Sequence, residues 1–276
     1  MALPLNELFN VKDKVVIITG GGRGIGKMMA EGFVKNHAKV YIASRTLKAL
    51  QETADELNAL GAGKCIALQA NLDNEDGCKA LADEIAKRES KVDVLINNSG
   101  VSFGGDINNH PGEAWDYVLN VNVKTPFFLV RDLLPLLDNA ATSEDGARVI
   151  MIGSMAGVMP LNLETTAYDT SKAAVHHMTR VLAAKLARRP NGGHITVNAI
   201  APGLVPTNMA DSIVDYTGIS YSDYGQLIPL GRAGRAYDMA GLAIFLASKA
   251  SSWITGMIIL SDGGHVAAAE ARMAKL

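Results

Sequence analysis

The chain has few of the features that mark several protein classes. It contains only two cysteines among 276 residues, and Cys65 and Cys78 stand too far apart for a zinc or redox motif. They are predicted to be buried and reduced. A formal net charge of −2 gives no electrostatic reason to expect a nucleic acid or an anionic membrane as partner. The six histidines form no metal-ligand pattern, so no metal is predicted.

Long apolar runs are also missing. No stretch reaches the roughly 18 uncharged apolar residues that a membrane helix needs, and the opening MALPLNELFNVKDK has no apolar run after a basic start. The sequence therefore predicts no secretion signal and a cytoplasmic location. The last three residues, Ala-Lys-Leu (274–276), resemble the peroxisomal address Ser-Lys-Leu. The peroxisome is the alternative location if the source is a eukaryote.

What the chain does have is a regular alternation of strands and helices. Near-continuous apolar runs, separated by stretches of helical periodicity, indicate a parallel sheet covered on both faces. The prediction is an α/β fold: a single Rossmann-like domain over residues 1–276, doubly wound, with a seven-stranded parallel sheet. The strands are expected at 14–20, 39–44, 64–70, 91–100, 147–154, 194–202 and 256–262.

Helices are expected between the strands, including two long ones at 112–139 and 168–189. The segment 203–229 is too long for an ordinary connection. It is predicted to be an irregular lid over a substrate site, with a plain surface loop as the alternative.

A glycine-rich turn, TGGGRGIG (19–26), joins the first strand to the first helix. Strict G-x-G-x-x-G spacing fails, because position 25 is isoleucine and 27 is lysine. G-x-x-x-G-x-G fits instead, through Gly20, Gly24 and Gly26. Glycines let the backbone approach a phosphate, and the helix start offers free N–H groups to a pyrophosphate. The turn therefore predicts a dinucleotide site.

The end of the second strand indicates which dinucleotide is bound. A Rossmann site for NAD usually has an acid there, whereas an arginine suits the 2′-phosphate of NADP. Here Ser44 stands at the acid's position and Arg45 follows it, while Arg23 adds a second cation inside the glycine turn. A forked donor for phosphate is present and a carboxylate is absent. NADP(H) is favoured, although two solvated surface arginines remain the alternative.

Tyr168 and Lys172 are four residues apart, on one face of a predicted helix. A phenol with a pKa near 10 is a poor acid–base catalyst at neutral pH. A nearby ammonium group is expected to stabilise the phenolate and lower that pKa. The same helix carries His176 and His177, which are predicted to serve packing or an interface, and Ser171, which is predicted to point away from the substrate.

Six motifs in order resemble the short-chain dehydrogenase/reductase family, in its compact branch with the Gly-x-x-x-Gly-x-Gly turn. They are TGGGRGIG (19–26), NNSG (97–100), Asn122 within LNVNVKTPFFL, Ser154 in MIGSMAG, YDTSK (168–172) and APG (201–203). The resemblance runs from Lys12 to Gly264. ARVIMIGSMAG and YDTSKAAVHHMTRVLA are also similar to stretches of NADPH-dependent 3-oxoacyl reductases of the rhamnolipid-biosynthesis type. Two positions depart from the family pattern, Ser99 for alanine and Asn71 for aspartate.

The resemblance implies the reduction of a carbonyl, reversible as the oxidation of an alcohol. It implies that Tyr168 gives the proton to the carbonyl oxygen and that Ser154 hydrogen-bonds this oxygen. Lys172 would also hold the nicotinamide ribose, and Asn122 would position a water leading to Lys172. Further cofactor contacts are implied for Ile25, Asn71, Leu72, Asn98, Gly100, Tyr168, Pro202, Gly203 and Thr207. A homodimer or homotetramer formed through the two long helices is also implied.

Three other functions were weighed against a ketone reductase. A polyol or sugar dehydrogenase with the same cofactor is the runner-up. A non-catalytic NADP-binding regulator predicts a damaged Tyr–Lys–Ser set, and here the set is intact. A hydrolase using Ser154 lacks its G-x-S-x-G elbow, because Ile152 stands two residues before the serine.

Overall fold

The core of the fold is one parallel sheet. The computed structural model describes residues 4–273, with side chains up to residue 269. Seven strands lie in the order β3-β2-β1-β4-β5-β6-β7, which confirms the predicted doubly wound sheet. They are β1 (Val15–Thr19), β2 (Lys39–Ser44), β3 (Lys64–Gln69), β4 (Val94–Asn97), β5 (Ala147–Ile152), β6 (Ile195–Pro202) and β7 (Ile258–Ser261). The order reverses between β1 and β4, which opens a crevice at the carboxyl ends of these strands.

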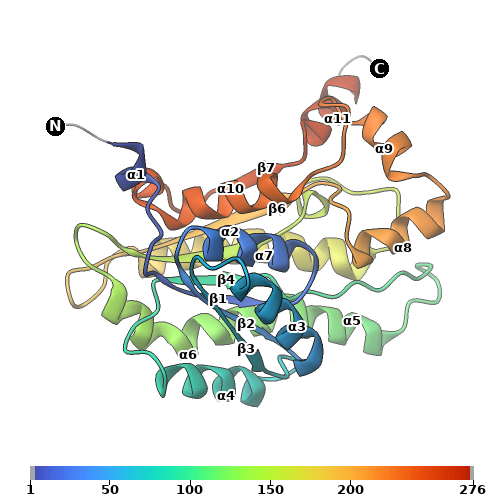
Figure 1. Ribbon diagram of the computed structural model, residues 1–276. Helices are drawn as coiled ribbons and strands as arrows, with labels where there is room; N and C mark the ends of the chain where they lie inside the picture. Colours follow the sequence, from blue (N-terminus) through green and yellow to red (C-terminus); the bar gives the residue numbers. More distant parts are fainter. Residues whose placement is uncertain (1–3, 274–276) are drawn as a thin grey trace.

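Helices cover both faces of the sheet. Figure 1 shows α2 and α10 above the strands and α4 and α6 below them. One layer contains α2 (Gly24–Lys35), α3 (Leu47–Asn58) and α10 (Ala236–Ala247), and the other contains α4 (Glu75–Ala86), α6 (Thr125–Ala140) and α7 (Thr166–Leu186). Side chains alternate along each strand, so Val16 and Ile18 of β1 enter the first core while Ile17 enters the second.

Short elements complete the chain. They are α1 (Leu5–Leu8), α5 (Gly112–Leu119), the π-helical turn η1 (Asn120–Lys124), the 3-10 turns η2 (Met155–Gly157) and η3 (Lys249–Ser251), α8 (Asn208–Thr217), α9 (Tyr221–Leu227) and α11 (His265–Met273). No helix within residues 4–273 is long and apolar enough to cross a membrane. The Ala-Lys-Leu tripeptide lies outside the described residues.

The predicted helix 112–139 is interrupted. α5 ends at Leu119, a π-helical turn follows over Asn120–Lys124, and α6 begins at Thr125. Apolar periodicity continues through all three pieces, which explains why the sequence predicted a single helix. A π turn accommodates one extra residue and is frequent at functional sites, and this one contains Asn122.

The segment 203–229 was predicted to be irregular, and this is wrong. It contains α8 and α9, and each begins with a side-chain cap. The Thr207 hydroxyl accepts from Ala210 N, and the Ser220 hydroxyl accepts from Asp223 N. Such caps satisfy N–H groups at a helix start. The predicted burial of the two cysteines is confirmed, because Cys65 is 3% and Cys78 0% exposed.

Candidate active site

The glycine turn brings the start of α2 against the end of β1. Gly20 and Gly24 have φ of +65° and +54°, in the left-handed region that favours glycine. A Cβ on Gly26 would lie 2.4 Å from the Gly20 carbonyl oxygen, so no side chain fits there. Arg23 precedes α2 without capping it through its side chain, and Ile25 is in its first turn. The start of this helix therefore suits an anionic group.

The crevice between β1 and β4 is lined by polar backbone and side-chain groups. The Asn98 side-chain amide donates to the Thr19 carbonyl oxygen at 2.8 Å, and the Thr19 hydroxyl accepts from Asn98 N and Ser99 N. A Cβ on Gly20 would lie 2.9 Å from Asn98 Nδ2. Sequence reasoning named Asn98 but missed Thr19, whose position before the glycine turn was the available signal. Thr19 fixes the spacing between the glycine turn and the NNSG segment.

Arg45 follows Ser44 at the end of β2 and is largely exposed. One guanidinium nitrogen lies 3.2 Å from a carboxylate oxygen of Asp73 and 3.2 Å from the Tyr117 hydroxyl. Tyr117 and Asp73 together raise the pKa of Arg45. Sequence reasoning missed both partners, which lie 28 and 72 residues further along the chain. The arginine is therefore held at this edge of the crevice by an exposed ion pair, which is weak enough to be exchanged.

Asn71 and Leu72 follow β3 on the same side of the sheet. Asn71 is exposed, and its side-chain oxygen accepts from Asp73 N at 3.4 Å. Leu72 is buried, and its carbonyl oxygen accepts from the Thr125 hydroxyl at 2.5 Å. Asn71 is therefore available to a ligand through its side chain. Leu72 presents its backbone instead.

Ser154, Tyr168 and Lys172 meet beyond the carboxyl end of β5. Ser154 follows β5 and precedes η2, where its hydroxyl accepts from Ala156 N at 3.1 Å. Tyr168 lies in the first turn of α7, with Lys172 one turn later and its Nζ 5.5 Å from the tyrosine ring centre. Lys172 Nζ donates to the Ile152 carbonyl oxygen at 2.9 Å. α7 and the end of β5 thus share one polar cluster.

Asn122 is 1% exposed and lies in the π turn. Its side-chain oxygen accepts from Val101 N, and its amide donates to the Val101 carbonyl oxygen, each at 2.9 Å. The same amide donates to the Ser171 hydroxyl at 2.9 Å. A Cβ on Gly100 would lie 3.4 Å from Asn122 Oδ1 and 3.5 Å from Lys172 Nζ. The structure thus brings Asn122, Gly100 and Lys172 together.

Ser171 has a larger part in this cluster than the sequence suggested. It is fully buried, accepts from Asn122 and donates to the Tyr168 carbonyl oxygen at 2.6 Å. Its hydroxyl therefore joins the π turn to the first turn of α7. The prediction that it points away from substrate gave it no role. Four-residue spacing alone could not reveal a bond to a residue 49 positions earlier.

The pKa values correct one expectation. Burial raises the pKa of Tyr168. The hydrogen bond with the Ser154 hydroxyl lowers this pKa, but its effect is smaller than that of burial. The predicted lowering of this pKa by Lys172 is therefore wrong for the cofactor-free protein. Burial instead lowers the pKa of Lys172 to about 8, because no carboxylate compensates the desolvated ammonium.

The two histidines behave as packing and surface residues. His176 is 3% exposed, and its Nδ1 lies 3.2 Å from the Gly157 carbonyl oxygen. A Cβ on Gly153 would lie 2.2 Å from His176 Nε2, so the ring fills the space beside that glycine. Burial lowers the pKa of His176 to about 4. His177 is exposed. Packing is confirmed for His176, directly beneath the turn that carries Ser154.

The loop after β6 leads toward the glycine turn and into α8 and α9. Pro202 is buried, and a Cβ on Gly203 would lie 2.8 Å from Asp262 Cα. Thr207 faces the glycine turn, since a Cβ on Gly24 would lie 3.2 Å from its methyl group. The loop therefore spans from β6 to the glycine turn.

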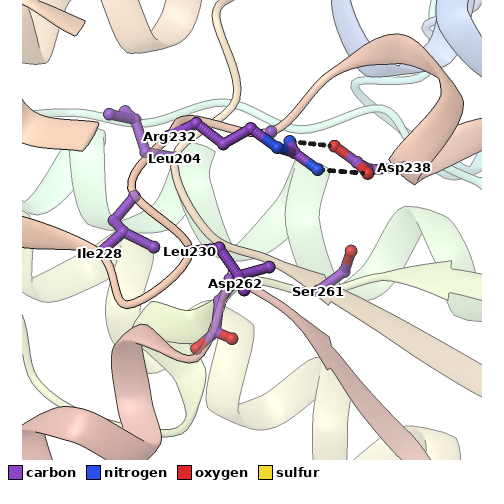
Figure 2. Close-up of a pocket in the computed structure, with 9 residues that line it drawn as sticks. Leu204, Ile228, Leu230, Arg232, Asp238, Ser261 and Asp262 are labelled. Atoms are coloured by element: carbon purple, nitrogen blue, oxygen red, sulfur yellow. Dashed lines mark hydrogen bonds and ion pairs between the residues drawn. The ribbon is translucent and has the colours of Figure 1, made fainter. Parts of the chain in front are cut away.

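Figure 2 shows a small pocket lined by residues that precede α8 and follow α9. Its volume is about 100 Å³. Leu204 and Ile228 line it, and Arg232 forms two hydrogen bonds with the Asp238 carboxylate, at 2.7 and 3.1 Å. This pair ties the end of the segment to α10. The charged side chains that line this pocket are thus already partnered, Arg232 with Asp238 and Asp262 with the backbone N–H groups of Gly264 and Val266.

Comparison with known proteins identifies the family of this chain. The short chain dehydrogenase model matches residues 14–217. The rhamnolipids biosynthesis 3-oxoacyl-[acyl-carrier-protein] reductase of Pseudomonas aeruginosa is 39% identical over 94% of this chain and 99% of its own. The 2-dehydro-3-deoxy-D-gluconate 5-dehydrogenase of Dickeya dadantii is 33% identical over 94% and 98%. The Pseudomonas aeruginosa RhlG/NADP active-site complex matches with a TM-score of 0.87 and 39% identity, over 94% of this chain and 98% of that one.

The chain belongs to the short-chain dehydrogenase family. The fold, the glycine turn and the Ser154–Tyr168–Lys172 cluster agree with this membership, and the chain is an oxidoreductase.

Proposed function

We propose that the protein is an NADPH-dependent reductase that converts a ketone to a secondary alcohol. The observation that carries the proposal is the meeting of Tyr168 and Lys172, on one face of α7, with Ser154 at the end of β5. The cluster lies beside a glycine turn whose helix has no side-chain cap. A proton donor and a dinucleotide site are thus adjacent.

Each polar group has a distinct proposed role. Tyr168 donates its proton to the carbonyl oxygen, and Ser154 donates a hydrogen bond to the same oxygen. NADPH, when held in this crevice, would supply the hydride that the carbonyl carbon needs. The Lys172 ammonium then returns a proton to the Tyr168 phenolate. Its pKa of about 8 permits this proton transfer near neutral pH. Asn122 stays fixed by Val101 and holds the water that leads to Lys172.

The residues around the crevice fit NADP(H). The backbone N–H groups of the turn would donate to the pyrophosphate, at Gly20, Gly24, Ile25 and Gly26, and Asn98 and Gly100 would line the crevice. Asn71 and Leu72 would contact the adenine, and Pro202, Gly203 and Thr207 the nicotinamide. Arg23 and Arg45 would hold the 2′-phosphate, with Ser44 replacing the acid of an NAD site. The solved Pseudomonas relative described as an NADP complex supports this choice.

Replacing Arg45 with aspartate should move the cofactor preference toward NADH. The substitution removes a charge-assisted contact to the 2′-phosphate and adds a repulsive charge beside Asp73. The KM for NADPH is expected to rise about 10-fold to 100-fold, because such a contact contributes about 1.5–3 kcal/mol. Steady-state kinetics with both cofactors measures the ratio. Lys48→Asp, in the first turn of α3, is the charge-matched control. An unchanged ratio would show that the phosphate is held elsewhere.

The substrate we propose is a 3-oxoacyl compound or another moderately hydrophobic ketone, covered by a lid over residues 203–229. Large apolar side chains exposed on the lid support it, among them Met209, Tyr216 and Leu227. The Pseudomonas reductase has a 3-oxoacyl substrate in its name. A sugar or polyol substrate is the second candidate, supported by the Dickeya dehydrogenase.

We also propose a homodimer or homotetramer. Phe127 of α6 and Val181 of α7 are exposed apolar side chains on the two long helices predicted to pair between subunits. Trp253, next to the edge strand β7, is 99% exposed and offers a further contact. Both cysteines are free, which suits the reducing cytoplasm where we place the enzyme.

A substrate panel tests the proposed function. NADPH oxidation is measured at a single enzyme concentration with 3-oxoacyl thioesters, cyclic ketones and keto-sugars as substrates. NADP⁺ reduction is measured in the same way with the matching alcohols. Turnover of the 3-oxoacyl or cyclic ketones supports the reductase. Turnover of the sugars alone would favour the second candidate.

A further inference from the structure

Three segments follow the carboxyl ends of β4, β5 and β6, the edge of the sheet at which the proposed site residues lie. They are 101–113, which follows the Val101 contact with Asn122; 155–167, which joins Ser154 to Tyr168; and 207–230, which contains α8 and α9. The first two are joined by a hydrogen bond from Gly105 N to the Glu164 carbonyl oxygen at 2.8 Å. In Figure 1, α8 and α5 lie at the same end of the molecule, one above the other. We call these segments the mouth.

The charges of the mouth have one sign. Its exposed acids are Asp106, Glu113 and Glu164 in the first two segments and Asp211, Asp215 and Asp223 in the third. None of these six makes an ion pair within the described chain, and the three segments contain no lysine or arginine. Burial, together with the carboxylates of Asp211 and Asp215, raises the pKa of Tyr221 to about 12. The rim therefore repels anions.

The opposite end of the site has the opposite character. Arg23 and Arg45 stand at the glycine turn and the end of β2, where the proposed cofactor places its phosphates. The mouth itself adds exposed apolar side chains to its acids: Phe103, Ile107, Val158, Met209, Tyr216 and Leu227. The anionic cofactor is thus expected to bind among positive charges, whereas the substrate is expected to enter past negative ones.

We infer that the mouth selects against substrates that carry phosphate or carboxylate at its rim, so that the enzyme reduces uncharged, moderately hydrophobic ketones in preference to acyl groups carried on coenzyme A or on an acidic carrier protein. The inference rests on the proposed reductase function and narrows its substrate class. A pantetheine arm would lead from a thioester at Tyr168 to a phosphate near the mouth, whose exposed charges are all acidic. Fields of one sign around a cleft alter encounter rates by about 10-fold or more and weaken steeply with salt.

Matched thioesters test the inference. 3-Oxodecanoyl-N-acetylcysteamine is uncharged, whereas 3-oxodecanoyl-coenzyme A presents the same reacting carbonyl with phosphates. At low ionic strength, kcat/KM is expected to be at least about tenfold higher for the uncharged thioester, and the gap should close as added salt shortens the screening length below about 8 Å. The thioester of an acidic acyl-carrier protein should behave like the coenzyme A thioester. Equal values at low salt would overturn the inference.

Charge-neutral variants locate the effect. Glu164→Gln with Asp215→Asn removes one carboxylate from each side of the mouth, and neither side chain has a hydrogen-bond partner to lose within the described chain. The double variant should raise kcat/KM for the coenzyme A thioester several-fold and leave the uncharged thioester unchanged. Asp76→Asn with Glu144→Gln, on α4 and at the far end of the strands, is the control and should change neither. An equal rise for both substrates, or in both double variants, would overturn the inference.

Calorimetry separates this inference from the proposed function. The product thioesters, 3-hydroxydecanoyl-N-acetylcysteamine and 3-hydroxydecanoyl-coenzyme A, are titrated into the protein at low and high salt. Binding of the second is expected to tighten with salt relative to the first. If no ketone is reduced but this dependence is seen, the proposed function fails and the charge selection stands. If reduction occurs without any salt dependence, the charge selection fails alone.

Discussion

Tyr168→Phe should lower kcat by about 100-fold to 10,000-fold, the range that a positioned general acid contributes. The substitution removes only the phenolic hydroxyl, so the ring keeps its place 5.5 Å from Lys172 Nζ. The dissociation constant for NADPH should stay within about twofold, because the glycine turn and Arg45 are untouched. Stopped-flow reduction and fluorescence titration with NADPH measure the two quantities.

Tyr237→Phe is the matched control, since that ring is 60% exposed at the start of α10. It should change neither quantity. Retention of turnover by Tyr168→Phe would assign the proton to another group. Loss of NADPH binding together with turnover would instead show that the hydroxyl supports the cofactor site.

Lys172→Met should abolish turnover and yet stabilise the cofactor-free protein at pH 7. The lysine is 4% exposed, and burial lowers its pKa from 10.5 to about 8. That shift corresponds to a cost of about 3 kcal/mol for the charged form. Methionine removes the cost but also the hydrogen bond to Ile152, which contributes about 1 kcal/mol. The free energy of unfolding should therefore rise by about 1–3 kcal/mol, measured by urea unfolding.

The advantage of the methionine variant should depend on pH. Below pH 8 the buried Lys172 is protonated in the folded protein, so the full desolvation cost of its ammonium lowers the free energy of unfolding. Between about pH 8 and 10.5 the folded lysine has lost its proton while the unfolded one keeps it, so the natural protein gains stability as pH rises. The two curves should converge over that interval. Lys185→Met, exposed on the same helix, should stay within about 0.5 kcal/mol of the natural protein at every pH.

The sequence predicted the sheet and the proposed catalytic cluster for different reasons. The strands were visible because they are buried on both faces, as in β1, where five consecutive residues are buried. The proposed site residues were found because the family resemblance attached chemistry to TGGGRGIG, Ser154 and YDTSK. Both signals are local, or follow a fixed order along the chain.

The contacts between segments could not be predicted in the same way. Arg45 with Asp73, Ser171 with Asn122 and Thr19 with Asn98 join residues 28, 49 and 79 positions apart. The hydrophobic periodicity of the sequence does not predict such pairs, because they depend on how distant segments pack around the crevice. The lid helices were missed because residues 203–229 carry mixed polar and apolar residues with glycine and proline, while their caps at Thr207 and Ser220 are visible only as hydrogen bonds.

The π turn at Asn120–Lys124 makes this stretch sensitive to its length rather than only to its composition. The turn holds one residue more than an α-helical turn, and that residue rotates Asn122 into its bonds with Val101 and Ser171. Deleting a single residue from Asn120–Lys124 is expected to make the helix continuous and to turn Asn122 by roughly 100° relative to one of the two flanking helices. Side chains around Asn122 can therefore drift during evolution, whereas insertions and deletions in these few positions disconnect the π turn from α7.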